Sequence, residues 1–189
     1  NVTPALGIGN NAEPPPEIIA AYRKVQPPFD EVYSSLLPMS LIHGLQLFWQ
    51  QQAFPRDFAR VKTVVPWIQY VAYCLSGKLV TEISGMACQS HLLNIRDGGY
   101  SSLVKRMGWE PLFPPMAKAW ETIGTLRGEF LGNGFRGRGN VLAGVHDSNA
   151  NYLRYLAGGQ KKFTLLSTGT WIIGFDTETI RTGQFNRVL

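Results

Sequence analysis

Cysteine and charged residues are scarce in this sequence, and long hydrophobic runs are missing from it. The chain holds two cysteines, Cys74 and Cys88, which form no Cys-x-x-Cys pair. A buried thiol is the expected role of Cys74, and a reducing, cytoplasmic location fits this cysteine usage best. No apolar run approaches the roughly 18 residues that a membrane-spanning helix needs, so no membrane partner is expected. The histidines have no ligand spacing with Cys88, so no protein-bound metal is predicted.

The composition is that of a globular protein. Hydrophobic residues make up 44% of the 189 residues and charged residues 16%, which excludes a disordered chain and supplies a sizeable core. The net charge of +5 suits anionic ligands such as nucleotides, but does not by itself call for nucleic acid. The length fits one domain, or one domain with part of another.

Four segments have the apolar spacing and the end signals of helices. Ser40 is expected to cap one of them, and Gly77 and Gly108 to end two others. The predicted helices span residues 17–25, 41–54, 66–77 and 100–107.

Glycine and arginine gather in residues 126–140, LRGEFLGNGFRGRGN. One interpretation is an RNA-binding segment that uses Phe135, Arg136 and Arg138, which would make binding strongly dependent on salt. A solvated loop or an interdomain connection is favoured, because two Arg-Gly pairs are few for an RNA-binding tract.

A predicted strand in VLAGVHDSNANYL, residues 141–153, ends at a histidine and an acid just before a predicted helix. Alternating strands and helices favour an α/β sheet, in which ligands gather outside the carboxyl ends of strands. Asp147 can accept a proton from a hydroxyl there, hold a metal, or only cap the helix, for which Ser148 is the other candidate. His146 is either a catalytic residue or a packed, hydrogen-bonded histidine.

A second turn, Ser167-Thr168-Gly169-Thr170, joins two further predicted strands. Its small side chains let backbone N–H groups approach an anion closely. A phosphate cradle beside an aspartate is what phosphoryl transfer to a hydroxyl needs. The alternative is an ordinary hairpin with a hydroxyl-rich turn.

With these motifs in order, the chain resembles the FGGY sugar kinases, which have the actin-like (ribonuclease H-like) ATPase fold. The matching segments are the Leu-x-Trp helix SLIHGLQLFWQQQAF, the long stretch PWIQYVAYCLSGKLVTEISGMACQSHLLNI, the strand-to-helix element LAGVHDSNANYL and the loop LLSTGTWIIGFD.

The resemblance implies a role for each site residue. Asp147 matches the family's catalytic base, which takes the proton from the sugar hydroxyl that attacks the γ-phosphate of ATP. His146 resembles a histidine of the rhamnulose and fuculose kinase branches, and Ser148 and Asn149, which flank the base, are expected to bind sugar or magnesium. Ser167, Thr168, Gly169 and Thr170 would meet the ATP phosphates, and Mg²⁺ would arrive with ATP.

Three positions depart from the family pattern. Gln69 and Glu82 stand where aspartate is usual or common, and Gln46 stands where a lysine is frequent. Neither Gln69 nor Gln46 is at a position that carries the phosphoryl chemistry, and the departures suggest a divergent branch.

The family's first phosphate loop, Asp-x-Gly-Thr, and its glycine-rich adenosine site do not occur in this sequence. An internal piece of a longer kinase is therefore expected, inactive by itself. Residues 1–127 would be the C-terminal part of the sugar-binding N-terminal domain, and residues 128–139 the hinge. Residues 140–189 would open the C-terminal domain with the second phosphate loop.

Two functions follow from the resemblance. The first is ATP-dependent phosphorylation of a small-molecule ketose, such as the deoxyhexuloses rhamnulose and fuculose, without a nucleic-acid partner and with a homodimer left open. The second is a non-catalytic sugar- or nucleotide-binding module of the same fold. Trp171 is either an aromatic that stacks on the sugar or a core residue of the hairpin.

Overall fold

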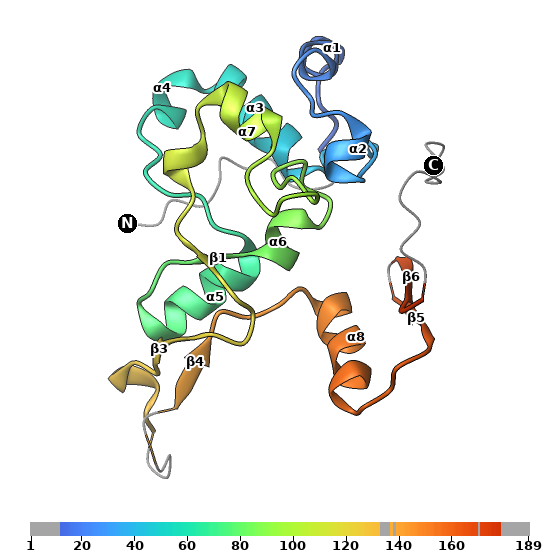
Figure 1. Cartoon of the computed structure of the whole chain (residues 1–189). Coiled ribbons are helices and arrows are strands. Elements are labelled where there is room, and N and C mark those ends of the chain that lie inside the picture. The colour runs from blue at the N-terminus through green and yellow to red at the C-terminus, as the bar shows by residue number, and fades with distance from the viewer. Residues whose placement is uncertain (1–11, 133–136, 138, 170, 179–189) are drawn as a thin grey trace.

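The computed structural model describes residues 12–132, 137, 139–169 and 171–178. Helices dominate, and the strands are short (Figure 1). No helix in these ranges is long and apolar enough to cross a membrane. One helical group contains α1 (Pro16–Arg23), α2 (Phe29–Val32), α3 (His43–Ala53), α4 (Pro55–Phe58) and α7 (Ser102–Met107).

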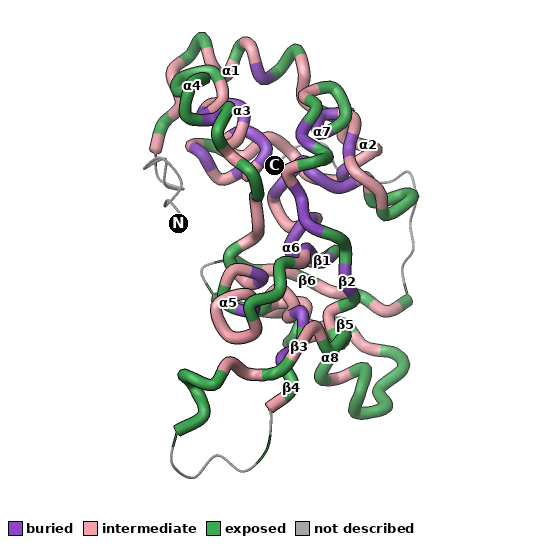
Figure 2. The backbone as a smooth tube through the Cα atoms, turned by 90° about the vertical axis from the view of Figure 1, so that its left-hand side faces the viewer, coloured by how far each residue is buried: buried purple, intermediate pink, exposed green. Residues whose placement is uncertain are grey.

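The hydrophobic core lies within this helical group, where Figure 2 shows most of the buried backbone. Tyr22 of α1 is fully buried, and its ring meets the edge of Phe48 from α3 at a centroid distance of 5.5 Å. The Tyr22 hydroxyl is hydrogen-bonded to Nδ1 of His91 at 2.9 Å, so its polar end is satisfied inside the core. Trp109 is buried after α7 and packs on Phe58.

Two of the predicted helix ends are confirmed, and one is wrong. Gly77 ends α5 (Trp67–Ser76) and Gly108 ends α7, both in the left-handed region that glycine adopts without strain. Ser40 does not cap α3, which begins after Ile42. The Ser40 hydroxyl instead donates to the carbonyl of Ala12 at 2.8 Å, a long-range bond that removes it from the helix end.

The described strands form three separate two-stranded sheets. β1 (Thr81–Glu82) pairs parallel with β2 (Met116–Ala117), whereas β3 (Thr122–Thr125) pairs antiparallel with β4 (Asn140–Leu142). β5 (Thr164–Thr168) and β6 (Ile172–Asp176) form the predicted hairpin. In Figure 1, β3 and β4 lie beside α5, and the hairpin lies near α8 (Asp147–Ala157).

The glycine- and arginine-rich segment joins the paired strands β3 and β4. At the near end of the segment, the N–H of Leu126 donates to the carbonyl of Gly139, and Arg127 lies over the ring of Tyr73 at 5.3 Å. The segment also holds a short 3₁₀ helix, η2 (Gly128–Phe130). A hinge at residues 128–139 stays a prediction, and Phe135, Arg136 and Arg138 lie outside the described residues.

Candidate functional site

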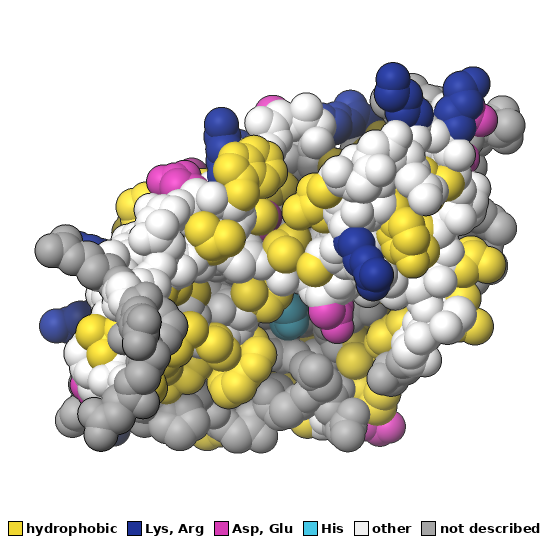
Figure 3. All heavy atoms as spheres, turned by 90° about the horizontal axis from the view of Figure 1, so that it is seen from below, with side chains coloured by type: hydrophobic (Ala, Val, Ile, Leu, Met, Phe, Trp, Pro, Cys, Tyr) yellow, Lys and Arg dark blue, Asp and Glu magenta, His cyan; other side chains and the backbone are white. Residues whose placement is uncertain are grey.

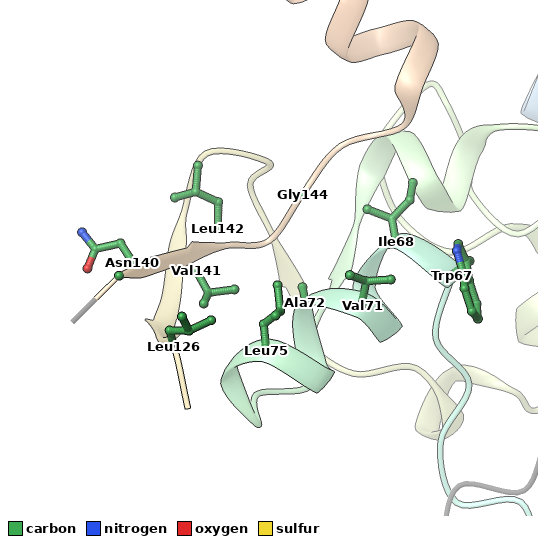
Figure 4. A pocket seen from close by; sticks show the side chains of 11 residues that line it. Trp67, Ile68, Val71, Ala72, Leu75, Leu126, Asn140, Val141, Leu142 and Gly144 are labelled. Carbon is green, nitrogen blue, oxygen red and sulfur yellow. The ribbon is translucent and has the colours of Figure 1, made fainter. Parts of the chain in front are cut away.

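Two cavities lie among the elements that follow α4, outside the helical group that holds the core. The first, of about 610 Å³, lies between α5 and the β3–β4 pair and is lined by apolar side chains with one asparagine (Figure 4). The second, of about 520 Å³, lies between α6 (Ile83–Ala87), the segment after β2, α8 and β6. We take the second as the candidate site because titratable side chains face it: Glu82, Cys88, Lys118 and His146. Figure 3 shows histidine and acidic side chains together in a hollow among hydrophobic side chains.

The start of α8 carries the predicted base, Asp147, between two residues that line this cavity, His146 and Ser148. β4 ends at Leu142, the chain turns at Gly144, and α8 begins at Asp147. The Asp147 side chain is 92% exposed, and its Oδ1 accepts the N–H of Ser148 at 2.6 Å. Ser148 and Asn149 line the cavity, as does His146, so three of the predicted sugar-binding residues lie together at the site.

The helix-cap interpretation of Asp147 or Ser148 is wrong. The N-cap position of α8 is His146, whose side chain makes no capping hydrogen bond. Asp147 lies one residue inside the helix, where its carboxylate is still near the positive end of the helix dipole. One of its oxygens accepts the first-turn N–H of Ser148, and the side chain stays exposed next to the cavity-lining residues.

A buried acid and a serine fix the backbone next to Asp147. Oε2 of Glu82, which is 5% exposed, accepts the N–H groups of Ser84 and Gly85 at 3.0 and 3.2 Å, and it also accepts the Ser84 hydroxyl proton. Oγ of Ser84 in turn accepts the N–H of His146 at 2.9 Å. This chain of bonds, the Glu82–Ser84–His146 clamp, ties the end of β1 to the start of α8.

Glu82→Ala is expected to lower the free energy of unfolding by about 1–2 kcal/mol, because it removes the cap of α6 and leaves Ser84 without its acceptor. Urea denaturation measures the change. The matched control is Glu121→Ala, since the Glu121 carboxylate also accepts a local backbone N–H but is exposed, and we expect it to cost less than about 0.5 kcal/mol. Equal losses in the two variants would contradict the clamp.

His146 is held by a thiol on one side and faces the base on the other. Its Nε2 lies 3.3 Å from Sγ of Cys88, and its Nδ1 lies 3.3 Å from Oδ1 of Asp147. That second pair is close but poorly aligned, so the buried Nδ1 has no hydrogen-bond partner. Burial, and secondarily the charge of Asp147, raises the pKa of the Cys88 thiol. Burial, with a smaller effect of His146, lowers the pKa of His43.

Gln69, one of the departures from the family pattern, supports the turn that leads to Asp147. It is fully buried on α5, and its Nε2 donates to the carbonyl of Ala143 at 3.2 Å. Its Oε1 has no hydrogen-bond partner in the structure. Gln69 therefore contacts the backbone of the β4–α8 connection and does not face the cavity.

The predicted phosphate-binding residues lie at the end of the β5–β6 hairpin. Ser167 and Thr168 end β5, and the N–H of Gly169 donates to the carbonyl of Trp171 at 3.0 Å within the turn. Thr170 lies outside the described residues. Among the described residues, no hydrogen bond or ion pair joins this turn to His146–Asn149, and a common site for the two groups stays a prediction.

The hairpin reaches the cavity through its apolar face instead. Ile173 and Phe175 of β6 line the cavity, and the Phe175 ring stacks on Tyr152 of α8 with a centroid distance of 5.1 Å. Trp171 is not among the lining residues, whereas Trp120, which is 67% exposed, is one of them. The tryptophan at the cavity is therefore Trp120, beside the aromatic residues Tyr152 and Phe175.

Sequence reasoning missed Ser84, Cys88, Lys118 and Trp120 as residues of the site. Ser84 and Cys88 contact His146 across 62 and 58 residues of chain, a separation with no local pattern. Lys118 and Trp120 follow the short strand β2, which ends at the buried Ala117. A lysine and a large aromatic residue just after the end of a strand are the sequence signal that could have identified them.

The sequence profile of the FGGY family of carbohydrate kinases, N-terminal domain, matches residues 29–153. The chain belongs to this family. The match includes α8 as far as Leu153, and so contains the Glu82–Ser84–His146 clamp and Asp147.

Solved structures of longer proteins share the fold of this FGGY chain over part of their length. A carbohydrate kinase from Novosphingobium aromaticivorans is 36% identical, with a TM-score of 0.77 over 87% of this chain and 37% of that chain. A xylulose kinase from Rhodospirillum rubrum is 18% identical, with a TM-score of 0.62 over 80% of this chain and 32% of that chain. The predicted actin-like ATPase fold, present in part, is confirmed.

A curated protein of Bacillus subtilis (strain 168), named "Putative sugar kinase YoaC", is 29% identical over 127 residues. The alignment spans 65% of the FGGY chain and 26% of that protein. The chain therefore covers well under half the length of these relatives. Its membership in the rhamnulose and fuculose kinase branch stays a prediction.

Proposed function

We propose that this FGGY chain works as part of a longer, ATP-dependent kinase that phosphorylates a hydroxyl of a small sugar. The observation that carries the proposal is the exposed Asp147 carboxylate between two cavity-lining residues, His146 and Ser148, on backbone fixed by the Glu82–Ser84–His146 clamp. A fixed carboxylate within reach of a bound hydroxyl is what general-base catalysis requires.

Asp147 has one oxygen engaged and one available for the proton. Oδ1 accepts the N–H of Ser148, and no hydrogen bond to Oδ2 is found among the described residues. In the proposed reaction, Oδ2 accepts the proton of the sugar hydroxyl as that oxygen attacks the γ-phosphorus of ATP. The bond to the leaving phosphate oxygen breaks in the same displacement.

The cavity offers groups that suit a sugar. Ser148 and Asn149 present a hydroxyl and an amide, which hydrogen-bond to sugar hydroxyls. The exposed indole of Trp120 gives an apolar face on which a sugar ring can stack. A ketose of the deoxyhexulose type, such as rhamnulose or fuculose, is the proposed substrate class, because His146 resembles a histidine of the rhamnulose and fuculose kinase branches.

ATP and Mg²⁺ are the proposed cofactors. The hydroxyls of Ser167 and Thr168 fit a phosphate group as donors, whereas the Gly169 N–H does not, because it already donates within the turn. Mg²⁺ held by the phosphates would supply charge neutralisation at the transferring group. Lys118, at the cavity, adds a positive charge on the protein side.

The surrounding organisation is part of the same proposal. Residues 1–127 would complete a sugar-binding domain, residues 128–139 would act as its hinge, and residues 140–189 would begin the ATP-binding domain. A cytoplasmic location and a homodimer are proposed with it, and the 189-residue chain alone is expected to be inactive.

The test is an ATP-consumption assay of the longer protein that contains this chain, over rhamnulose, fuculose, xylulose, ribulose and glycerol. Turnover of one ketose, at least tenfold faster than that of the others, would support the proposal and name the substrate. Sugar or nucleotide binding without turnover of any sugar would favour the non-catalytic module of the same fold.

A further inference from the structure

The two ring nitrogens of His146 have different neighbours. Nε2 lies 3.3 Å from the Cys88 sulphur, within reach of a hydrogen bond that involves sulphur. Nδ1 is buried, lies 3.3 Å from Oδ1 of Asp147 and has no aligned partner. Which nitrogen carries the proton therefore decides what His146 presents to the carboxylate.

The two neutral tautomers differ in electrostatic energy. With the proton on Nε2, this nitrogen would donate to sulphur, a weak acceptor, and the Nδ1 lone pair would face a carboxylate oxygen. With the proton on Nδ1, the Cys88 thiol donates to Nε2, a much better acceptor, and the positive end of the Nδ1–H dipole lies beside Oδ1 of Asp147. The second arrangement gives Nε2 a hydrogen-bond donor and makes the electrostatic contact between Nδ1 and Asp147 favourable.

The thiol must keep its hydrogen in order to donate it. Cys88 is half-buried and free, and burial together with the charge of Asp147 raises its pKa, so the thiol form is favoured at neutral pH. The backbone N–H of His146 donates to Oγ of Ser84, independently of the ring. This bond holds the main chain in the place that keeps the ring near Cys88 and Asp147.

We infer that Cys88 is a positioning residue, which donates its thiol hydrogen to Nε2 of His146 and so keeps the ring proton on Nδ1, beside Oδ1 of Asp147. This role would direct proton acceptance to Oδ2, because Oδ1 already accepts the N–H of Ser148 and then also lies beside the positive end of the Nδ1–H dipole. The role in catalysis rests on the proposed function, but the position of the proton does not.

The position of the proton is measured by ¹⁵N NMR of the histidine rings in the 189-residue chain, since protonated and unprotonated ring nitrogens resonate far apart. His146→Asn identifies the signals of this ring among the three histidines. The expected result is a protonated Nδ1 and an unprotonated, hydrogen-bonded Nε2. A protonated Nε2, in either the neutral ring or the imidazolium, would overturn the inference.

Three variants test the part of the thiol. Cys88→Ala is expected to shift the ratio of the two tautomers about five-fold toward protonated Nε2, the effect of one typical hydrogen bond. Cys88→Ser keeps a donor and is expected to restore the ratio to within about two-fold of the unsubstituted chain. Cys74→Ala, at the other free and half-buried cysteine, is the matched control and should leave it unchanged. An unchanged ratio in Cys88→Ala would assign the tautomer to Asp147 alone and overturn the role of Cys88.

The kinase assay separates failure of this inference from failure of the proposed function. If His146 has the expected tautomer but no sugar is phosphorylated, the proton position stands and the proposed function falls, and the positioning role falls with it. If a sugar is phosphorylated, Cys88→Ala should lower kcat several-fold with little change in KM, and Cys88→Ser should recover most of the rate. Equal kcat values in Cys88→Ala and the unsubstituted kinase would show that the thiol positions nothing that catalysis uses.

Discussion

Asp147→Asn is expected to lower kcat of the longer kinase by about 100- to 10,000-fold, the usual contribution of a general base. The amide oxygen can still accept the N–H of Ser148, so the start of α8 keeps its geometry. The amide cannot take a proton from the attacking sugar hydroxyl, so KM for the sugar should change much less than kcat. Steady-state kinetics on the substrate found in the ketose panel gives both values.

The matched control for Asp147→Asn is Asp57→Asn. Asp57 is also a solvent-exposed aspartate in the first turn of a helix, α4, where it pairs weakly with Arg60 at 3.7 Å. Its removal should leave kcat within about two-fold, since exposed pairs of this kind contribute little. If Asp147→Asn retained more than half of the unsubstituted rate, Asp147 would not be the base.

Gly144→Ala is expected to lower the free energy of unfolding by about 2–5 kcal/mol. Gly144 has a φ of +86°, a conformation that costs a residue with a side chain about 1–2 kcal/mol. An added Cβ would also lie 2.8 Å from Cγ2 of Ile68 on α5, and overpacking of this kind adds about 1–3 kcal/mol. Figure 4 shows Gly144 beside Ile68 at the apolar cavity. Urea denaturation measures the loss.

Gly159→Ala separates the two causes. Gly159 has nearly the same φ, +83°, but an added Cβ there meets no atom within 4 Å. Its expected cost is therefore the backbone cost alone, about 1–2 kcal/mol. Equal losses in the two variants would show that α5 yields to the added methyl group, and that the close approach of Gly144 to Ile68 has no energetic weight.

Local features of the fold could be predicted because their signals are local. Gly77 and Gly108 end their helices as expected, since glycine reaches the left-handed region without strain. The hairpin of β5 and β6 follows from two apolar runs around a small, polar turn. Ser40 misled the prediction because a serine before an apolar run is a common cap, whereas here a distant carbonyl takes its hydroxyl proton.

The candidate site could be predicted only where its residues are contiguous. His146, Ser148 and Asn149 line one cavity because they lie together at the N-cap and in the first turn of α8. Cys88 and Ser84 reach the same place through tertiary contacts, which leave no periodic trace in the sequence. The phosphate-binding turn was assigned by order along the chain, and order does not fix the distance between Gly169 and Asp147 in space.

The Glu82–Ser84–His146 clamp has a consequence for how such a site can diversify. Ser84 accepts a backbone N–H, a group that every residue except proline supplies at position 146. Natural variation of the side chain at this position can therefore alter what the cavity recognises while the neighbouring carboxylate keeps its place. An enzyme built in this way could change the sugar it recognises by single substitutions at position 146, at the cost of the contribution of the ring to turnover but not of the position of the base.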